Sequence, residues 1–129
     1  MKIIEFKSFE DDRGSLLPIE FGDLPFTPKR VFLINNVPIG SIRGNHAHYE
    51  TEQFLFCISG SIEVILNDGE AENCFIINKN QGVLVPKLIW DSQKFLYPNS
   101  ILLVLCSTKY DERDYIFDFN LFKSLKFSK

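Results

Sequence analysis

Residues 53–66 read QFLFCISGSIEVIL, and this stretch decides the fold. In its second half Ile62, Val64 and Leu66 share one face, which is typical of a half-buried β-strand. Ser59-Gly60 separates this run from the apolar run before it and has the length of a two-residue hairpin connection. The stretch therefore predicts two antiparallel strands.

Similar short β-type runs, separated by turn residues, recur along the chain, and Asn67-Asp68-Gly69 supplies the next reversal. Their repeated spacing favours an all-β sandwich or a small antiparallel β-barrel. A short helix is expected only near the C-terminus, over 118–125, where apolar residues recur every three to four positions. The expected strands are 2–7, 14–20, 30–35, 53–58, 61–66, 73–78, 82–86 and 100–107.

Length and composition limit the classes of protein to consider. The 129 residues are expected to form one domain, 1–129, with a real hydrophobic core. A hydrophobic content of 45% excludes a disordered chain, and a net charge of −3 argues against a nucleic-acid partner. No apolar run approaches the roughly 20 residues that span a bilayer, so no membrane partner is expected. The N-terminus has charges where a signal peptide is apolar, and the three cysteines lack metal-type spacing, so we expect a cytoplasmic protein.

Both histidines of the chain lie in Arg43-Gly44-Asn45-His46-Ala47-His48. Residues at i and i+2 of a strand face the same side, so both imidazoles would enter one space. Because imidazole titrates near neutral pH, two of them in one place indicate proton transfer or metal ligation. The alternative is that two solvated strand histidines lie together by chance.

The residues around the histidines resemble the first motif of the cupin superfamily. Gly40, His46, His48, Gln53 and Gly60 follow the order of that motif, with Gln53 where metal-binding members usually have Glu. The resemblance implies a small antiparallel β-barrel or jelly roll of the cupin, RmlC-like type, here with a short C-terminal helix.

The second cupin motif, Pro-x-Gly-x-x-His, is only partly kept. Residues 86–91 read PKLIWD, so the glycine position is leucine and the last histidine position is Asp91. A four-ligand site would be His46, His48, Gln53 and Asp91, but a neutral amide is a poorer ligand than a carboxylate. We therefore expect no metal, and expect Asp91 to hydrogen-bond a histidine and set its tautomer. A metal-dependent oxygenase or isomerase using His46, His48 and Asp91 is the alternative.

Further segments extend the likeness over nearly the whole chain. They are Asp12-Arg13-Gly14-Ser15-Leu16, Pro25-Phe26 with Lys29-Arg30-Val31-Phe32, Arg43-Gly44-Asn45-His46-Ala47-His48, Gly60-Ser61 followed by Asp68-Gly69, and Tyr110-Asp111-Glu112-Arg113-Asp114-Tyr115-Ile116 with Phe119 and Phe122. In this order they resemble the metal-free cupin sugar 3,4-ketoisomerases, which act on dTDP-4-keto-6-deoxyglucose.

This resemblance implies an isomerase that needs no cofactor and turns the 4-keto sugar into the 3-keto sugar. It implies a dTDP-sugar in each barrel and a homodimer whose N-terminal strands exchange between subunits. The product would feed a transaminase that makes 3-amino-3,6-dideoxyhexoses for surface polysaccharide, such as the O-antigen of lipopolysaccharide. The Arg13-Gly14 pair resembles the branch that gives the galacto product.

The implied chemistry gives roles to three residues. By position, His46 would remove the hydrogen on C3 to give an enediolate, and His48 would shuttle a proton between the two oxygens. Arg43 is the cation expected beside the developing enediolate. Strand alternation would point Arg43 away from the histidines unless Gly44 makes a bulge that turns it inward. If it does not, Arg43 is a surface arginine.

The expected contacts to the substrate are less specific. Arg13, Lys29 and Arg30 are candidates for the diphosphate, although each would also suit a solvated strand edge. Gln53 is a candidate for a sugar hydroxyl or a plain buried amide, and Trp90 for a cavity wall or a core residue. The full set of expected substrate-binding residues is Arg13, Gly14, Lys29, Arg30, Gln53, Trp90 and Asp91.

The sequence departs from the family's pattern at three places. Phe32-Leu33 stands where members often have a tyrosine, Asp91 replaces a more usual histidine, and Phe117 occupies a position that is commonly basic. These departures bear on the exact substrate and stereochemistry more than on the reaction class. A nucleotide-sugar-binding cupin without catalysis is the remaining alternative.

Overall fold

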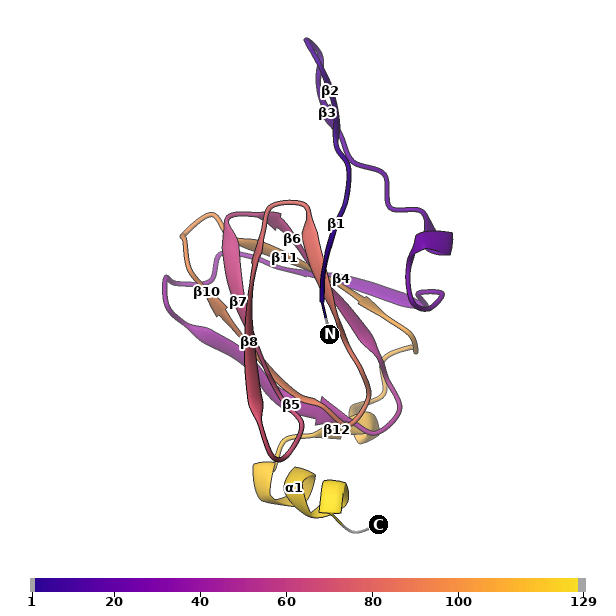
Figure 1. The fold of residues 1–129 in the computed structure, drawn as a ribbon, viewed down its shortest axis with the longest axis vertical. Coiled ribbons are helices and arrows are strands. Elements are labelled where there is room, and N and C mark those ends of the chain that lie inside the picture. Colours follow the sequence, from indigo (N-terminus) through magenta and orange to yellow (C-terminus); the bar gives the residue numbers. More distant parts are fainter. Residues whose placement is uncertain (1, 128–129) are drawn as a thin grey trace.

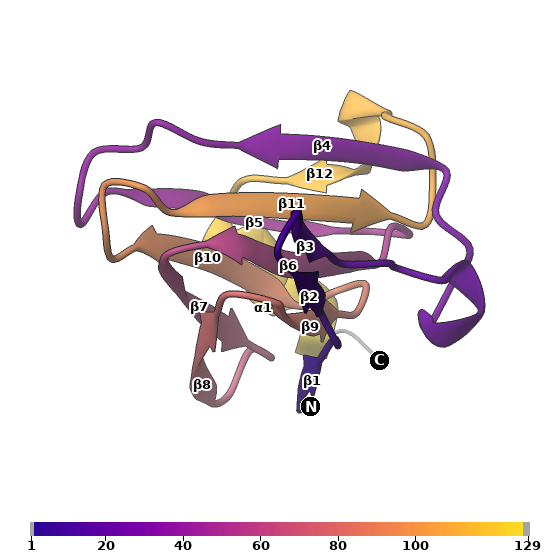
Figure 2. The same cartoon turned by 90° about the horizontal axis from the view of Figure 1, so that it is seen from above.

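The computed structural model describes residues 2–127 and shows two antiparallel sheets that face one another as a flattened barrel (Figure 1; Figure 2). Residues 1, 128 and 129, the ends of the expected domain, lie outside this description. One sheet has the order β1-β9-β6-β11-β4 and the other β12-β5-β10-β7-β8. The expected all-β architecture with a short C-terminal helix is confirmed.

The elements follow the chain as short strands joined by turns. Their bounds are β1 Ile3–Glu5, β2 Phe9–Asp11, β3 Gly14–Leu16, η1 Phe21–Asp23, β4 Arg30–Ile34, β5 Ile42–His48, β6 Gln53–Ser59, β7 Ser61–Asn67, β8 Glu72–Asn78, β9 Gln81–Val85, β10 Trp90–Phe95, β11 Ile101–Cys106, η2 Glu112–Asp114, β12 Tyr115–Ile116 and α1 Phe119–Phe127.

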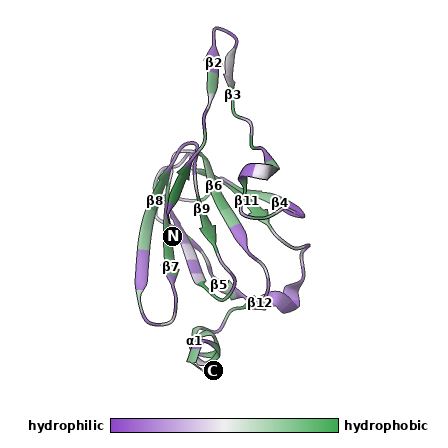
Figure 3. Cartoon of the chain, turned by 45° about the vertical axis from the view of Figure 1, so that its right-hand side comes forward, coloured by the Kyte–Doolittle hydropathy of each residue, from purple (hydrophilic) through white to green (hydrophobic). Residues whose placement is uncertain are grey.

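The core lies between the two sheets and follows from the alternation in residues 53–66. On β7, Ile62, Val64 and Leu66 are buried and the residues between them are half-buried, as the period of two predicts. On β6 both faces are buried, because the N-terminal segment covers the outer one. There Phe54 and Phe56 pack edge-on against Phe6, with ring centroids 5.9 and 5.2 Å apart. Figure 3 shows apolar residues along β6, β9 and β11.

The turn between β6 and β7 needs a glycine. Gly60 has a φ of +73°, and a Cβ at this position would lie 2.7 Å from the Cα of Ser100. Only glycine adopts this conformation readily and leaves that space free. The two strands and the tight turn between them are as predicted, but the hairpin predicted from Ser59-Gly60 is wrong. Strand β6 pairs with β9 and β11 while β7 pairs with β10 and β8, so this turn carries the chain from one sheet to the other.

Three elements differ from the expected ones. The strand expected over 14–20 ends at Leu16, shortly before Pro18, which cannot donate a hydrogen bond to a neighbouring strand. Strand β10 was not predicted because Asp91, Ser92 and Gln93 interrupt any apolar alternation, yet all three are buried between β5 and β7. The helix α1 begins one residue later and ends two residues later than expected.

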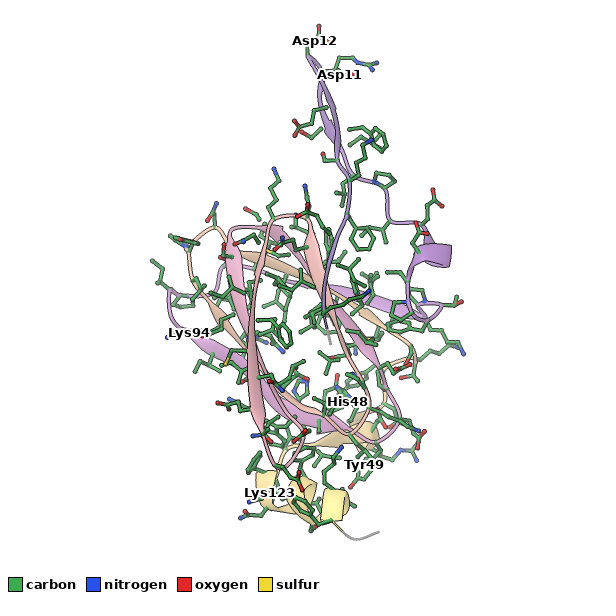
Figure 4. The ribbon with its side chains drawn as sticks, in the orientation of Figure 1. Asp11, Asp12, His48, Tyr49, Lys94 and Lys123 are labelled. Atoms are coloured by element: carbon green, nitrogen blue, oxygen red, sulfur yellow. The ribbon has the colours of Figure 1, made fainter. Side chains whose placement is uncertain are left out.

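Strands β2 and β3 pair only with each other and form a hairpin that projects from the barrel, here called the arm (Figure 1). Two large apolar side chains of the arm, Phe9 and Leu16, are 53% and 63% exposed. Asp11 and Asp12 mark its far tip, well away from His48 in the barrel (Figure 4). Among the residues described, no helix is long and apolar enough to cross a membrane.

Candidate active site

A cavity of about 450 Å³ opens between the sheets, a size suited to a small-molecule ligand. It is lined from both sheets and from the segment that precedes α1. The lining residues are Arg30, Phe32, Leu33, Ile34, Arg43, Gly44, His46, Gln53, Leu55, Gln93, Val104, Tyr115 and Phe117. Four of the residues expected at the site, Arg30, Arg43, His46 and Gln53, therefore meet in one place.

A β-bulge in β5 brings Arg43 and His46 to the same cavity. The register against β10 shifts here, because His46 is opposite Asp91 while Gly44 is opposite the next residue, Ser92. Gly44 and Asn45 have φ values of +86° and +57°, and a Cβ on Gly44 would lie 3.0 Å from the carbonyl oxygen of Asp91. Without the extra residue, Arg43 and His46 would face opposite sides of the strand. The bulge that the sequence suggested is present.

His46 lies over a fully buried carboxyl group. Its Nε2 is 3.8 Å from Oδ2 of Asp91, and the two side chains are 16% and 0% exposed. Burial lowers the pKa of His46 to about 4, with repulsion from His48 as the second cause. Burial also raises the pKa of Asp91 to about 8, although a hydrogen bond from Gln93 opposes the shift. Both pKa shifts favour the uncharged forms, so this contact joins two neutral groups at pH 7.

The expected hydrogen bond between Asp91 and a histidine is not formed, because 3.8 Å exceeds hydrogen-bond length. Asp91 accepts one from Gln93 Nε2 through its other oxygen, Oδ1. Asp91 lies behind His46 and does not line the cavity, which departs from the expectation that it contacts substrate.

His48 is buried deeper than His46 and faces a different carboxylate. Its side chain is 4% exposed, and its Nδ1 lies 3.3 Å from Oδ2 of Asp114. Burial lowers the pKa of His48, and the charge of Asp114 opposes the shift. The two imidazoles are 5.0 Å apart between ring centroids, and Tyr115 packs 4.4 Å from His48 and 5.3 Å from His46. The two rings are therefore neighbours, as their spacing predicts, but of the two it is His46 that lines the cavity.

Unpartnered polar atoms concentrate at this site. Among the residues described, the buried side-chain nitrogen and oxygen atoms without a hydrogen-bond partner are His46 Nε2, both ring nitrogens of His48, and Asp91 Oδ2. Such atoms are costly to bury, and in native proteins they mark places where function requires them. Within residues 2–127, no three His, Cys, Asp or Glu side chains are grouped so that they could hold a metal ion.

Arg30 is held at the cavity by aromatic rings. Its guanidinium carbon lies 4.5 Å from the ring centroid of Phe32 and 4.8 Å from that of Tyr110. Its Nη1 donates to the Tyr115 hydroxyl at 3.4 Å. Phe117 stacks on Tyr115, with centroids 5.5 Å apart, so this wall is aromatic. The cations that line the cavity within the described chain are therefore Arg30 and Arg43.

Four other expected site residues lie outside the cavity. Trp90 packs under α1, with its ring 5.1 Å from Phe119 and 5.7 Å from Phe122, so it is a core residue and not a cavity wall. Lys29 is exposed and does not line the cavity. Arg13 and Gly14 lie on the arm and line a separate hollow of about 470 Å³, where Arg13 pairs with Asp11 at 2.6 Å.

The sequence interpretation missed two polar residues of the site, Gln93 and Asp114. Gln93 lines the cavity and donates to Asp91, but no alternation marked its strand. Asp114 accepts hydrogen bonds from the backbone of Glu50 and Thr51, which lie 64 and 63 residues earlier. No local pattern reveals such a distant contact.

Comparisons with known proteins agree with this geometry. The family model described as FdtA: WxcM-like, C-terminal, matches residues 1–127. A curated relative, the TDP-4-oxo-6-deoxy-α-D-glucose-3,4-oxoisomerase of Aneurinibacillus thermoaerophilus, is 38% identical over 124 residues, which are 95% of this chain and 89% of the relative.

Two solved structures from Campylobacter jejuni are similar over almost their whole length. The TDP-fucose-3,4-ketoisomerase WlaRA is 35% identical with a TM-score of 0.87, covering 98% of this chain and 96% of its own. The TDP-quinovose 3,4-ketoisomerase WlaRB is 36% identical with a TM-score of 0.86, covering 95% of both chains.

Proposed function

The chain belongs to the FdtA family (WxcM-like, C-terminal), and we propose that it is a TDP-4-keto-6-deoxyglucose 3,4-ketoisomerase that works by histidine acid–base chemistry. As a member of this group it is an isomerase of keto sugars. The observation that carries the proposed mechanism is the bulge at Gly44, which brings Arg43 and His46 to one cavity, with the ring of His48 5.0 Å from that of His46.

His46 is the proposed base for the hydrogen on C3. This hydrogen is acidified by the adjacent C4 carbonyl, and its removal gives an enediolate. His46 lines the cavity, and its lowered pKa keeps it uncharged at pH 7, as a base must be. Arg43 lines the same cavity, where a cation stabilises the negative charge that develops on the enediolate oxygens.

His48 is the proposed shuttle between the two oxygens. It takes the hydroxyl proton from O3 of the enediolate and delivers it to O4, and protonated His46 then returns its proton to C4. These transfers turn the C4 carbonyl into a hydroxyl and the C3 hydroxyl into a carbonyl, with no net gain or loss of atoms or electrons. A ring centroid separation of 5.0 Å between the histidines suits two neighbouring carbons of one sugar.

The nucleotide is proposed to extend out of the cavity past Arg30 and toward the arm of a second chain. Arg13 and Gly14 project from their own barrel, and the arm exposes Phe9 and Leu16. A homodimer that exchanges N-terminal strands would cover these side chains and bring Arg13 to the partner's cavity. Analytical ultracentrifugation tests the dimer, and a Phe9→Ser, Leu16→Ser variant is expected to weaken it.

The decisive experiment is incubation with TDP-4-keto-6-deoxyglucose in deuterated water, followed by NMR. Deuterium entry at C3 together with a new 3-keto species supports the proposal. Tight binding without exchange would point to a binding protein, and one equivalent of bound metal by elemental analysis, with loss of activity after chelation, would favour a metal-dependent isomerase.

The arm is the basis for proposing the configuration of the product at C4. Relatives named for TDP-fucose and TDP-quinovose are almost equally similar to this chain, at 35% and 36% identity, so overall identity does not choose between them. The Arg13-Gly14 pair is the basis for proposing the galacto product. Supply of 3-amino-3,6-dideoxyhexoses for surface polysaccharide, and a cytoplasmic location, stay predictions that gene disruption and cell fractionation test.

A further inference from the structure

The carboxylate of Asp114 is fixed by the turn that follows β5. Its Oδ1 accepts a hydrogen bond from the backbone N–H of Glu50 at 2.8 Å, and its Oδ2 accepts one from the backbone N–H of Thr51 at 3.1 Å. The Thr51 hydroxyl also donates to Oδ2 and lies 2.6 Å from the hydroxyl of Thr108. Because both oxygens accept hydrogen bonds from this turn, the carboxylate is held in one orientation.

In that orientation Asp114 faces one nitrogen of His48 only. Oδ2 lies 3.3 Å from Nδ1, an ion-pair contact, while both ring nitrogens are buried and neither makes a hydrogen bond of full geometry among the described residues. A carboxylate is an acceptor, so it stabilises the tautomer that carries the proton on the nitrogen beside it. The same contact leaves a lone pair on Nε2, and Tyr115, packed 4.4 Å from the imidazole, limits rotation of the ring.

We infer that Asp114 is the positioning residue of His48: it holds the proton on Nδ1 so that Nε2 accepts the hydroxyl proton of the enediolate. This inference rests on the proposed function, in which His48 moves a proton from O3 to O4. Asp114 itself touches neither the cavity nor the reacting atoms. It determines which nitrogen of His48 carries the lone pair.

The tautomer can be read directly, because the natural chain has only two imidazoles. In ¹⁵N-labelled protein without a tag, long-range proton–nitrogen correlations distinguish protonated from unprotonated ring nitrogens, and a His46→Asn variant assigns the signals. At pH 7 we expect His48 to carry its proton on Nδ1. A proton on Nε2 of His48 in the wild-type protein overturns the inference without any assay of activity.

Asp114→Asn tests the functional consequence. The amide is uncharged and has one acceptor oxygen for the Glu50 donor, the Thr51 donors and the His48 contact together, so the Nδ1 proton loses its charged acceptor and the proton of His48 should move to Nε2. We expect kcat for the 3-keto product to fall about 100-fold with little change in KM, the scale of a lost proton transfer. Deuterium exchange at C3, which needs His46, should continue, and the pKa of His48 should fall further because Asp114 opposes its lowering.

A purely structural role predicts otherwise. If the folded Asp114→Asn protein keeps the Nδ1 proton, or if exchange and product formation fall together, the inference is wrong. Asp118→Asn is the matched control, since Asp118 caps α1 by accepting from Asn120 and Leu121, and Asn caps a helix equally well. It should leave kcat and both tautomers unchanged.

A second variant covers the case in which Asp114→Asn fails to fold. Thr51→Val removes one donor to Oδ2 and keeps the carboxylate, so we expect a smaller loss of kcat, about threefold to tenfold, again without loss of C3 exchange. Unchanged kcat in this variant would contradict the inference. A wild-type protein with the expected tautomer but no isomerisation would overturn the proposed function and leave the pairing of Asp114 with His48 standing.

Discussion

The two histidines of the site each face a carboxyl group, and the two carboxyl groups have opposite surroundings. Asp91 is fully buried and, among the residues that the structure describes, accepts a hydrogen bond from Gln93 alone and leaves Oδ2 without a partner. Asp114 accepts from three donors on one turn. A buried carboxyl group with few hydrogen-bond donors around it is more stable in its neutral form, whereas a carboxyl group that accepts several hydrogen bonds is more stable in its charged form. The same residue type thus gives His46 a neutral neighbour and His48 a charged one.

The difference between the histidines is tested most strongly by replacing each in turn. His46→Asn is expected to reduce deuterium exchange at C3 by about 10³-fold or more, because the base is lost. His48→Asn should keep that exchange within about tenfold and reduce the 3-keto product about 100-fold. NMR of the substrate in deuterated water measures both, and circular dichroism checks the fold. If both variants lost deuterium exchange at C3 to the same extent, the assignment of His46 as the base and His48 as the shuttle would be wrong.

Arg43 belongs to the His46 side of the comparison. Arg43→Gln removes the cation proposed to lie beside the enediolate and should lower kcat about 100-fold, since a preorganised charge stabilises the negative charge that develops there. The tautomer of His48 should not change. Steady-state kinetics measure the effect, with Lys123→Gln, a charge removed from the surface of α1, as the control. If Arg43→Gln turned over substrate at the normal rate, Arg43 would be a surface arginine with no part in the reaction.

The neutral state of Asp91 has a consequence for stability against pH. Its folded pKa of about 8 exceeds the unfolded value near 3.8, so between these values the native state holds the extra proton and stability falls as pH rises. His46, lowered from 6.5 to about 4, acts in the opposite sense between pH 4 and 6.5. His48 is lowered too and adds to this opposite effect below 6.5. Asp91 is therefore the group that acts from pH 6.5 to 8.

Urea unfolding at pH 6.5 and pH 8 measures this contribution. The wild-type protein is expected to lose about 2 kcal/mol of unfolding free energy over that interval, from about 1.4 kcal/mol per proton per pH unit. Asp91→Asn keeps an acceptor for Gln93 and cannot titrate, so its stability should be level over the same interval. A wild-type protein that gains stability between pH 6.5 and 8 would show that Asp91 is charged.

The smallest expected effect lies on the Asp114 side. Thr108→Val removes the hydroxyl that lies 2.6 Å from that of Thr51 and should destabilise the protein by about 1 kcal/mol, the usual net value of one hydrogen bond. The midpoint of urea unfolding measures it. Because the donors to Asp114 remain, kcat should be nearly unchanged. A large loss of kcat would mean that the network around Asp114 acts as one unit.

The part of the site that the sequence predicts correctly depends on neighbours along the chain. The spacing of His46 and His48 places both rings in one space, and Gly44 marks the bulge that turns Arg43 toward them. These inferences need only the period of a strand and the conformational freedom of glycine.

The part that it misses depends on contacts across the fold. Trp90 belongs to the core because α1, more than twenty residues later, packs on it. Asp114 reaches His48 because β12 pairs with β5, with Tyr115 opposite His48. The polar strand β10 is buried because it pairs with β5 on one side and with β7 on the other. Local pattern cannot supply such pairings, since each one depends on the order of strands in the sheet.

The arm pairs only with itself, so its length and side chains can change without disturbing the packing of the barrel. If the arm helps to orient the sugar of a partner subunit, natural selection can alter the stereochemical outcome there while the proton-transfer machinery stays untouched. The molecule would then diversify through this projecting hairpin, and a chimera carrying a relative's arm on this barrel would be the natural route to a new product.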